Sequence, residues 1–401
     1  MSQDARTSNS TLAAAKPRAP LAALARSTLR ACLADRSTLA ALILVQLLLL
    51  LPALVGYPTL SNQAVGQQQA RQTLEILSAN MSGGVFDSAP EALLDINARE
   101  LDALGDATSA PYPSSDFFAA YARYFDIEIE SARAGYAEPD PSLCARSELV
   151  HQLASLEYPE VYPTAAVMPA TYYAAFVLGL MPGIVPLLPV ALLAAASQRR
   201  LGRRTLEQAA PVSQAGKRMV TLGTAAVLAM AVLAIELAPA VLLALVRSGL
   251  GSLAYPVVSI VDGTVCSSSI GELLARDAAL LGASALTTAA LAAAVESALP
   301  RTGLAAALAL LALPLMPLYA SQSEGWRAIA RHLPSSYLSC GSIVGMPVYA
   351  NGLDIRVIPG TTWELGCMTL LASAAVLALL ALLASALREK VASRRLERRF
   401  S

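Results

Sequence analysis

The chain has 401 residues, of which 55% are hydrophobic and 14% are charged, and its formal net charge at pH 7 is zero. Soluble globular domains carry about 25% charged residues, so this composition excludes an ordinary soluble domain. Uncharged apolar stretches long enough to cross a bilayer recur along the chain, and they predict an all-α polytopic membrane protein with six transmembrane helices.

The charges are distributed unevenly along the chain. Residues 1–37, 199–218 and 388–401 together hold 18 of the 29 Lys and Arg residues, whereas residues 57–170 hold 16 Asp and Glu against five Arg. Cationic residues beside membrane spans are retained in the cytoplasm, so the three basic segments and both termini are expected inside the cell. The chain has no uniformly basic face, and we therefore expect no nucleic-acid partner.

The first predicted elements are a cytoplasmic tail, residues 1–37, and a first span, residues 38–56. Within the tail, apolar positions from Leu21 follow helical spacing with Arg26 and Arg30 on another face. This pattern predicts an amphipathic helix in the inner membrane interface, with an ordinary cytoplasmic helix as the alternative. The first span is interpreted as an uncleaved anchor rather than a secretory signal, because the basic region before it is too long.

Residues 57–169 form the one sizeable predicted extramembrane domain, expected to be extracellular, acidic and helical. Ser88 and Glu91 have the spacing of a capping box that opens a helix. An aromatic stripe at residues 117–125 and an apolar stripe at 142–157 predict two further helices that pack together. The acidic balance either attracts cationic ligands or forms a solvated face.

The second predicted span, residues 170–196, contains three prolines, which predict a kinked helix. Gly179 and Gly183 have a spacing that permits close helix approach. The basic segment 197–218 follows. In it, Thr205 and Gln208 have capping-box spacing and Pro211 limits the helix to a turn or two. We expect a short interfacial helix that an intracellular partner binds.

The sequence TLEQAAPVS followed by Lys217, placed between two spans, resembles the first cytoplasmic loop of ABC-2 type ABC-transporter permeases. The matching positions are Thr205, Leu206, Pro211, Val212, Ser213 and Lys217. Arg204 stands in place of the family's usual Gly, and Gln198, Arg199 and Arg200 stand where an acidic residue is usual. The order of the predicted spans is also similar along most of the chain.

The resemblance implies a membrane permease subunit of an ABC exporter. The Ala- and Arg-rich composition suggests a bacterium of high GC content, so we expect the bacterial plasma membrane. Its expected partners are a separate ABC ATPase subunit, a second permease subunit in a homodimer or heterodimer, and membrane lipid. The residues expected to transmit ATP-driven motion are those of the coupling segment, Thr205, Leu206, Glu207, Pro211 and Lys217. The family is also expected to have short re-entrant or interfacial helices before its last span.

The third predicted span, residues 219–246, contains the acidic residue Glu236. At 1.5 Å per residue this carboxylate lies about 25 Å from the inner end of the span. A carboxylate inside a membrane is costly and is a candidate for a substrate pathway. The alternatives are a side chain that reaches the outer headgroups, or one that is hydrogen-bonded within the bundle.

The remaining chain continues the same alternation. We expect an outer loop at 247–272 and a fourth span at 273–295, with Arg276 and Asp277 near the outer end of that span. An inner turn at 296–302 leads to a fifth span at 303–319. An outer loop with short helices, 320–362, precedes a sixth span, 363–387, and a basic cytoplasmic tail, 388–401.

The sequence carries no recognisable catalytic or metal-binding motif. The segment 209–218 lacks the glycine and the Ser or Thr of a P-loop, and His151 and His332 lie in no zinc motif. We therefore expect no cofactor and no enzymatic activity, and active transport would need an ATPase on another chain. The five cysteines lack metal-site spacing, although one disulfide among Cys144, Cys266 and Cys340 remains open. The alternative function is a membrane-anchored receptor or scaffold that binds a ligand through residues 57–169.

Overall fold

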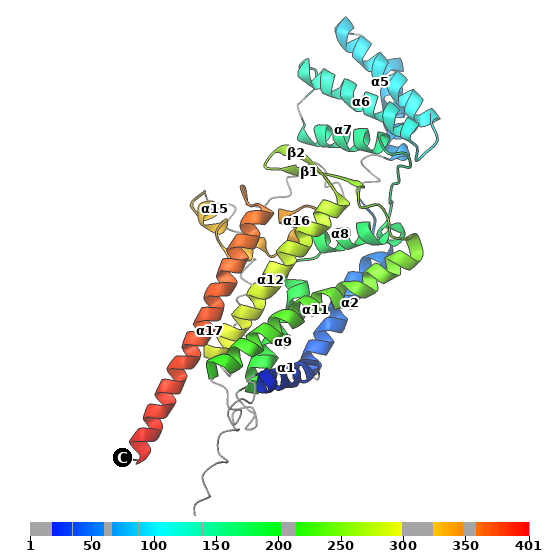
Figure 1. The fold of residues 1–401 in the computed structure, drawn as a ribbon. Coiled ribbons are helices and arrows are strands. Elements are labelled where there is room, and N and C mark those ends of the chain that lie inside the picture. Colours follow the sequence, from blue (N-terminus) through cyan, green and yellow to red (C-terminus); the bar gives the residue numbers. More distant parts are fainter. Residues whose placement is uncertain are drawn as a thin grey trace, which may run out of the picture.

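The computed structural model describes residues 18–33, 35–59, 66–86, 88–137, 140–201, 214–298, 324–347 and 358–400. Figure 1 shows two bodies, a bundle of long helices and a smaller group of helices beyond one end of it. The two bodies have separate hydrophobic cores.

Four described helices are long and apolar enough to cross a membrane, and they indicate a membrane protein. They are α2 (Arg36–Val55), α11 (Gln214–Ser248), α12 (Ile270–Ala298) and α17 (Trp363–Phe400). A fifth crossing is present if the bent pair α8 (Ala170–Leu180) and α9 (Ile184–Leu201) counts as one span. The predicted fifth span, residues 303–319, lies outside the described residues.

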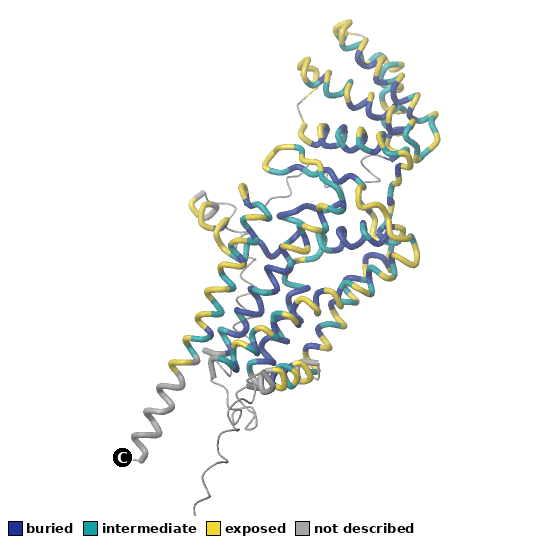
Figure 2. Tube along the Cα trace, viewed as in Figure 1, coloured by how far each residue is buried: buried dark blue, intermediate teal, exposed yellow. Residues whose placement is uncertain are grey.

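Helix α12 occupies the centre of the bundle. Of its most apolar stretch, 61% is buried, against 11% for α17. It packs against α17, α9, α11 and α8. Figure 2 shows α12 mainly buried beside α17, whose coloured turns are mostly exposed or intermediate. The many alanines of α12 suit this position, because small side chains let neighbouring helices approach closely.

The N-terminal elements follow the sequence prediction closely. Helix α1 (Arg18–Leu33) packs against α9 and α11, with Arg26 and Arg30 exposed. Helix α2 begins after Asp35, whose carboxylate accepts a hydrogen bond from the Thr38 backbone N–H, and it ends at Gly56 with φ of 63°. An acidic N-cap and a left-handed glycine are the usual signals for helix ends.

The second body, here called the four-helix domain, consists of α4 (Gln67–Ser82), α5 (Glu91–Ser109), α6 (Ser115–Arg133) and α7 (Pro141–Ala154). The predicted aromatic stripe on α6 is confirmed as core. Its buried members are Phe117, Phe118, Tyr121, Tyr124 and Phe125. Their rings meet in edge-on and tilted pairs with centroids 4.7 to 5.6 Å apart, a geometry that aromatic pairs favour.

One prediction is wrong here, and the all-α prediction, which the mostly helical structure bears out, is incomplete. Helix α5 has Pro90 as its N-cap residue without a side-chain cap, so Ser88 and Glu91 form no capping box. The all-α prediction also misses a β-hairpin, β1 (Pro256–Val261) and β2 (Thr264–Ser269), in the predicted outer loop. The hairpin turns at Asp262 and Gly263, both with positive φ, and Asp-Gly is a favoured pair for such a turn.

The hairpin connects the two bodies. Gln152 Nε2 on α7 donates a hydrogen bond to Ser267 Oγ on β2 at 2.5 Å. Tyr255, immediately before β1, packs against both hydrophobic cores. Its ring meets that of Tyr162 at a tilt and that of Tyr172 edge-on, with centroid distances of 5.6 and 5.3 Å. Because Tyr172 belongs to α8, the four-helix domain is joined to the first half of the broken span.

Candidate site at a broken membrane helix

The predicted second span, residues 170–196, is not one helix. Helices α8 and α9 meet at an angle of 81°, with only Met181, Pro182 and Gly183 between them. Pro182 has no N–H and forces the preceding residue into an extended conformation, and Met181 has φ −78° and ψ 134°. The prediction of a proline-induced distortion is therefore confirmed, but the distortion is a break rather than a kink.

A short irregular segment packs directly on this break. It contains the 3₁₀ turn η2 (Pro334–Tyr337) and the single turn α16 (Cys340–Ile343), and it follows helix α15 (Glu324–Ala330). A Cβ atom built on Gly183 would lie 1.4 Å from the Leu338 carbonyl oxygen, and one built on Gly341 would lie 2.1 Å from the Gly179 carbonyl oxygen. The predicted close approach at Gly179 and Gly183 is thus confirmed, and the structure shows that residues 338–341 make it. We call residues 338–341 the plug segment.

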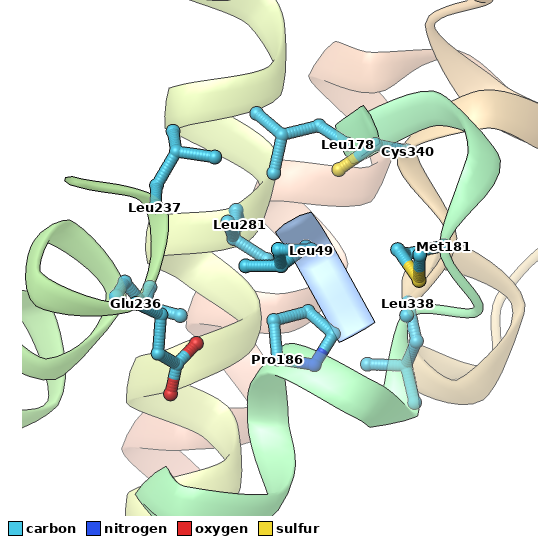
Figure 3. Close-up of a pocket in the computed structure, with 11 residues that line it drawn as sticks. Leu49, Leu178, Met181, Pro186, Glu236, Leu237, Leu281, Leu338 and Cys340 are labelled. Carbon is cyan, nitrogen blue, oxygen red and sulfur yellow. The ribbon is translucent and has the colours of Figure 1, made fainter. Parts of the chain in front are cut away.

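A cavity lies between the break, the plug segment and three spans. Figure 3 shows Leu49 of α2, Pro186 of α9 and Leu281 of α12 near its middle, with Glu236 of α11 on one side and Met181 and Leu338 on the other. About 30 Å³ is open to the centre of a water molecule, which is room for two or three waters at roughly 10–15 Å³ each. The walls are apolar except at Glu236 and Cys340.

Glu236 is 1% exposed, and neither of its carboxylate oxygens has a hydrogen-bond partner among the described residues. The structure therefore supports neither alternative for this residue, since the side chain does not reach the surface and is not hydrogen-bonded within the described bundle. Glu236 lies in the wall of the cavity, and its place in a substrate pathway stays a prediction.

A second carboxylate, which sequence reasoning did not select, lies close by. Asp277 on α12 is fully buried, and its oxygens also lack hydrogen-bond partners of normal geometry among the described residues. It neighbours the thiol of Cys340, which lines the cavity. Arg276 does not neutralise it, because that side chain turns outward to Glu272 at 3.5 Å. The signal that could have identified Asp277 is an acidic residue one turn before Leu281, at the start of the long uncharged stretch of α12.

Most of the predicted coupling segment lies outside the described residues, including Thr205, Leu206, Glu207 and Pro211. Lys217 is described, and it lies in the first turn of α11 with only 3% of its surface exposed. The Thr221 hydroxyl donates to the Lys217 carbonyl at 2.9 Å. Because α9 ends at Leu201 and α11 begins at Gln214, the coupling segment connects the ends of two helices that both line the cavity.

The four-helix domain contains a separate acidic pair, the buried Glu100 and the partly buried Glu128. Burial raises the pKa of Glu100 to about 7, with a further contribution from the charge of Glu128. Burial also raises the pKa of Glu128, and Arg146 opposes this increase. Glu128 Oε2 and Asn97 Nδ2 have no hydrogen-bond partner in the described part of the chain. The pair is therefore a candidate for pH-dependent stability of this domain.

The described residues contain no group of three or more His, Cys, Asp or Glu side chains placed to hold a metal ion. Four described cysteines, Cys144, Cys266, Cys340 and Cys367, are free thiols. No family model, no curated protein and no solved structure matches this chain. The resemblance to ABC-2 permeases is therefore carried by the residues at 205–217 and by the order of the spans.

Proposed function

We propose that the chain is the membrane-spanning permease subunit of an ABC exporter, driven by ATP hydrolysis on a separate subunit. The observation that best supports this proposal is the break between α8 and α9, which faces a cavity with a buried, unpartnered Glu236. Interrupted helices inside a membrane are tolerated where they adjoin a cavity or neighbouring protein, and they mark binding sites in many transporters.

The helix lengths give a route from the coupling segment to the cavity. Helix α9 is 18 residues long, about 27 Å, and leads from Leu201 beside the coupling segment to Ile184 at the break. Along α11, Lys217 and Glu236 are 19 residues apart, or about 28 Å. A partner that binds residues 202–213 more tightly in one arrangement of these two helices would shift the bundle toward that arrangement.

A membrane-anchored receptor or scaffold is the second candidate. The observation in its favour is that the four-helix domain has its own aromatic core and contacts the bundle through the hairpin. A single span would anchor such a domain, however, and anchoring requires neither a broken helix nor buried carboxylates. We therefore favour the exporter.

Purification of the tagged full chain from its own cells in mild detergent tests the proposal. We expect an ATPase to accompany it, with vanadate-sensitive ATP hydrolysis that the double substitution Leu206→Asp and Pro211→Gly uncouples from transport. Leu250→Asp is the matched control, because it makes the same change at an exposed position beyond the other end of α11. Unchanged ATPase activity and transport in the double variant would show that the coupling assignment is wrong. Absence of any ATPase from the purified material would favour the receptor or scaffold.

A further inference from the structure

Two acidic side chains lie in the bundle where an ion is poorly stabilised. Glu236 and Asp277 are 1% and 0% exposed, and all four carboxylate oxygens lack hydrogen-bond partners of normal geometry among the described residues. An ionised carboxylate without a partner costs several kcal/mol when it is buried. Each group therefore requires a positive charge from outside the described chain, or a bound proton.

The groups that face the two carboxyls from neighbouring helices do not supply that charge. From α2, Gln46 Nε2 already donates to the Ile235 carbonyl at 3.0 Å. The cavity wall contributed by α8, α9 and α12 is apolar. The plug segment contributes the Cys340 thiol, which lies beside Asp277 and within electrostatic range of Cys367 on α17.

The nearest described cations are engaged or distant. Arg276 pairs with Glu272, and Arg247 Nη1 donates to the Ala53 carbonyl at 3.3 Å. Lys217 lies about 28 Å from Glu236 along α11. Shortly before the plug segment, Arg331 Nε donates to His332 Nε2 at 3.3 Å, and both side chains are exposed. Glu364 at the start of α17 is acidic and also exposed.

The size of the cavity limits the charge carrier. Room for two or three waters excludes an organic cation of drug size in this arrangement, whereas a proton delivered by water fits. We propose that Glu236 and Asp277 form a proton-binding site in the bundle, reached by water through the cavity at the break between α8 and α9. Each carboxylate binds one proton as a neutral acid, and it returns that proton to water when the break and the plug segment separate.

The part of this inference that concerns transport depends on the proposed function. If the chain is an exporter, movement of α9 changes the access of water to the cavity, so protons exchange during each transport cycle. The site itself requires no ATPase. The two ideas can therefore fail separately.

Infrared difference spectroscopy of the full chain in lipid vesicles, without nucleotide or ATPase, tests the site. At neutral pH we expect a carbonyl stretch from protonated carboxyl groups that shifts on exchange into deuterium oxide. Glu236→Gln and Asp277→Asn should each remove part of this band, and Glu364→Gln, the exposed control, should leave it unchanged. Burial raises the pKa of Glu100 to about 7, so protonated Glu100 absorbs in the same spectral region. The spectrum of each variant is therefore compared with that of the native chain.

If neither substitution changes the band, both carboxylates are ionised and the proton-binding site is disproved. Glu236→Asp controls for a band that is lost only because a variant misfolds. It keeps a carboxyl group at this position, so the carbonyl band should shift rather than disappear. An unchanged band in this variant would equally contradict the proposal. If the band is present and no ATPase co-purifies with the chain, the proton-binding site is confirmed and the exporter is rejected. If the band is absent and an active ATPase co-purifies, the exporter is supported and the proton-binding site is rejected.

Discussion

Replacement of Gly183 by alanine tests the packing of the plug segment on the broken span. The added methyl carbon would lie 1.4 Å from the Leu338 carbonyl oxygen and 2.2 Å from its carbon. Ordinary contacts between such atoms are about 3.5–4.0 Å, so the plug segment or the start of α9 must move by roughly 2 Å. Overpacking costs about 1–3 kcal/mol and occasionally more. Here the obstacle is backbone, and we expect a loss of about 3 kcal/mol or more.

Thermal unfolding in detergent, followed by intrinsic fluorescence, measures this loss. A decrease of 3 kcal/mol corresponds to a fall in Tm of about 4 °C for a chain of this length. Displacement of the plug segment should also speed maleimide labelling of Cys340, which is 4% exposed in the native chain. Gly223→Ala is the matched control, because a Cβ there meets nothing within 4 Å in the middle of α11. If Gly183→Ala melts at the same temperature as the control and Cys340 stays protected, the described contact is wrong.

Three further substitutions test other parts of the structure through the Tm of the full chain. Ser114→Ala should cost about 1 kcal/mol, because its hydroxyl caps α6 by accepting from the Phe117 N–H at 3.1 Å. Glu100→Gln should raise the Tm at pH 8 and not at pH 4. The pKa of Glu100 is raised in the folded state, so ionisation of this side chain lowers the stability of the native chain as the pH rises from about 4.5 to about 7. Tyr173→Phe should cost about 1 kcal/mol, since its hydroxyl accepts from the Ala53 N–H and donates to the Leu49 carbonyl in α2.

Each of these substitutions has a control and a contradicting result. Ser88→Ala, at the rejected capping box, should leave the Tm unchanged, and a loss as large as that of Ser114→Ala would restore the box. Glu91→Gln removes an exposed carboxylate from the same helix as Glu100, so an equal pH effect in both variants would contradict burial as the cause. Tyr57→Phe removes the hydroxyl of a half-exposed tyrosine, and an effect equal to that of Tyr173→Phe would contradict the bridging role.

The sequence was sufficient where local pattern and burial agree. The spans at α2, α11, α12 and α17 begin and end within a few residues of their predicted limits, apart from the longer C-terminal part of α17, because long apolar stretches have few alternatives in a bilayer. The aromatic positions of α6 follow a helical period and form its core. The hairpin could have been predicted, because Asp262-Gly263 separates two runs that contain Val, Ile and Thr.

The candidate site was less accessible to sequence reasoning. Pro182 predicts a distortion, but the 81° angle depends on residues 338–341, more than 150 positions away, that pack on Gly183. Asp277 was not selected, since its burial arises from α12 lying at the centre of the bundle rather than from its neighbours in sequence. Such long-range contacts leave no periodic signal. For this reason the sequence identifies Glu236, as an acidic residue inside a predicted span, whereas Asp277 is identified only by its buried position in the structure.

The side of the membrane on which residues 202–213 lie tests the central claim most directly, since an ATPase inside the cell can act only on a segment that faces it. In intact cells or right-side-out vesicles, a Glu207→Cys chain is treated with a membrane-impermeant maleimide before and after permeabilisation. Native Cys144, exposed on α7, serves as the internal reference for the opposite side. The proposed exporter predicts immediate labelling of Cys144 and labelling at position 207 only after permeabilisation. Labelling at position 207 in intact membranes would contradict it.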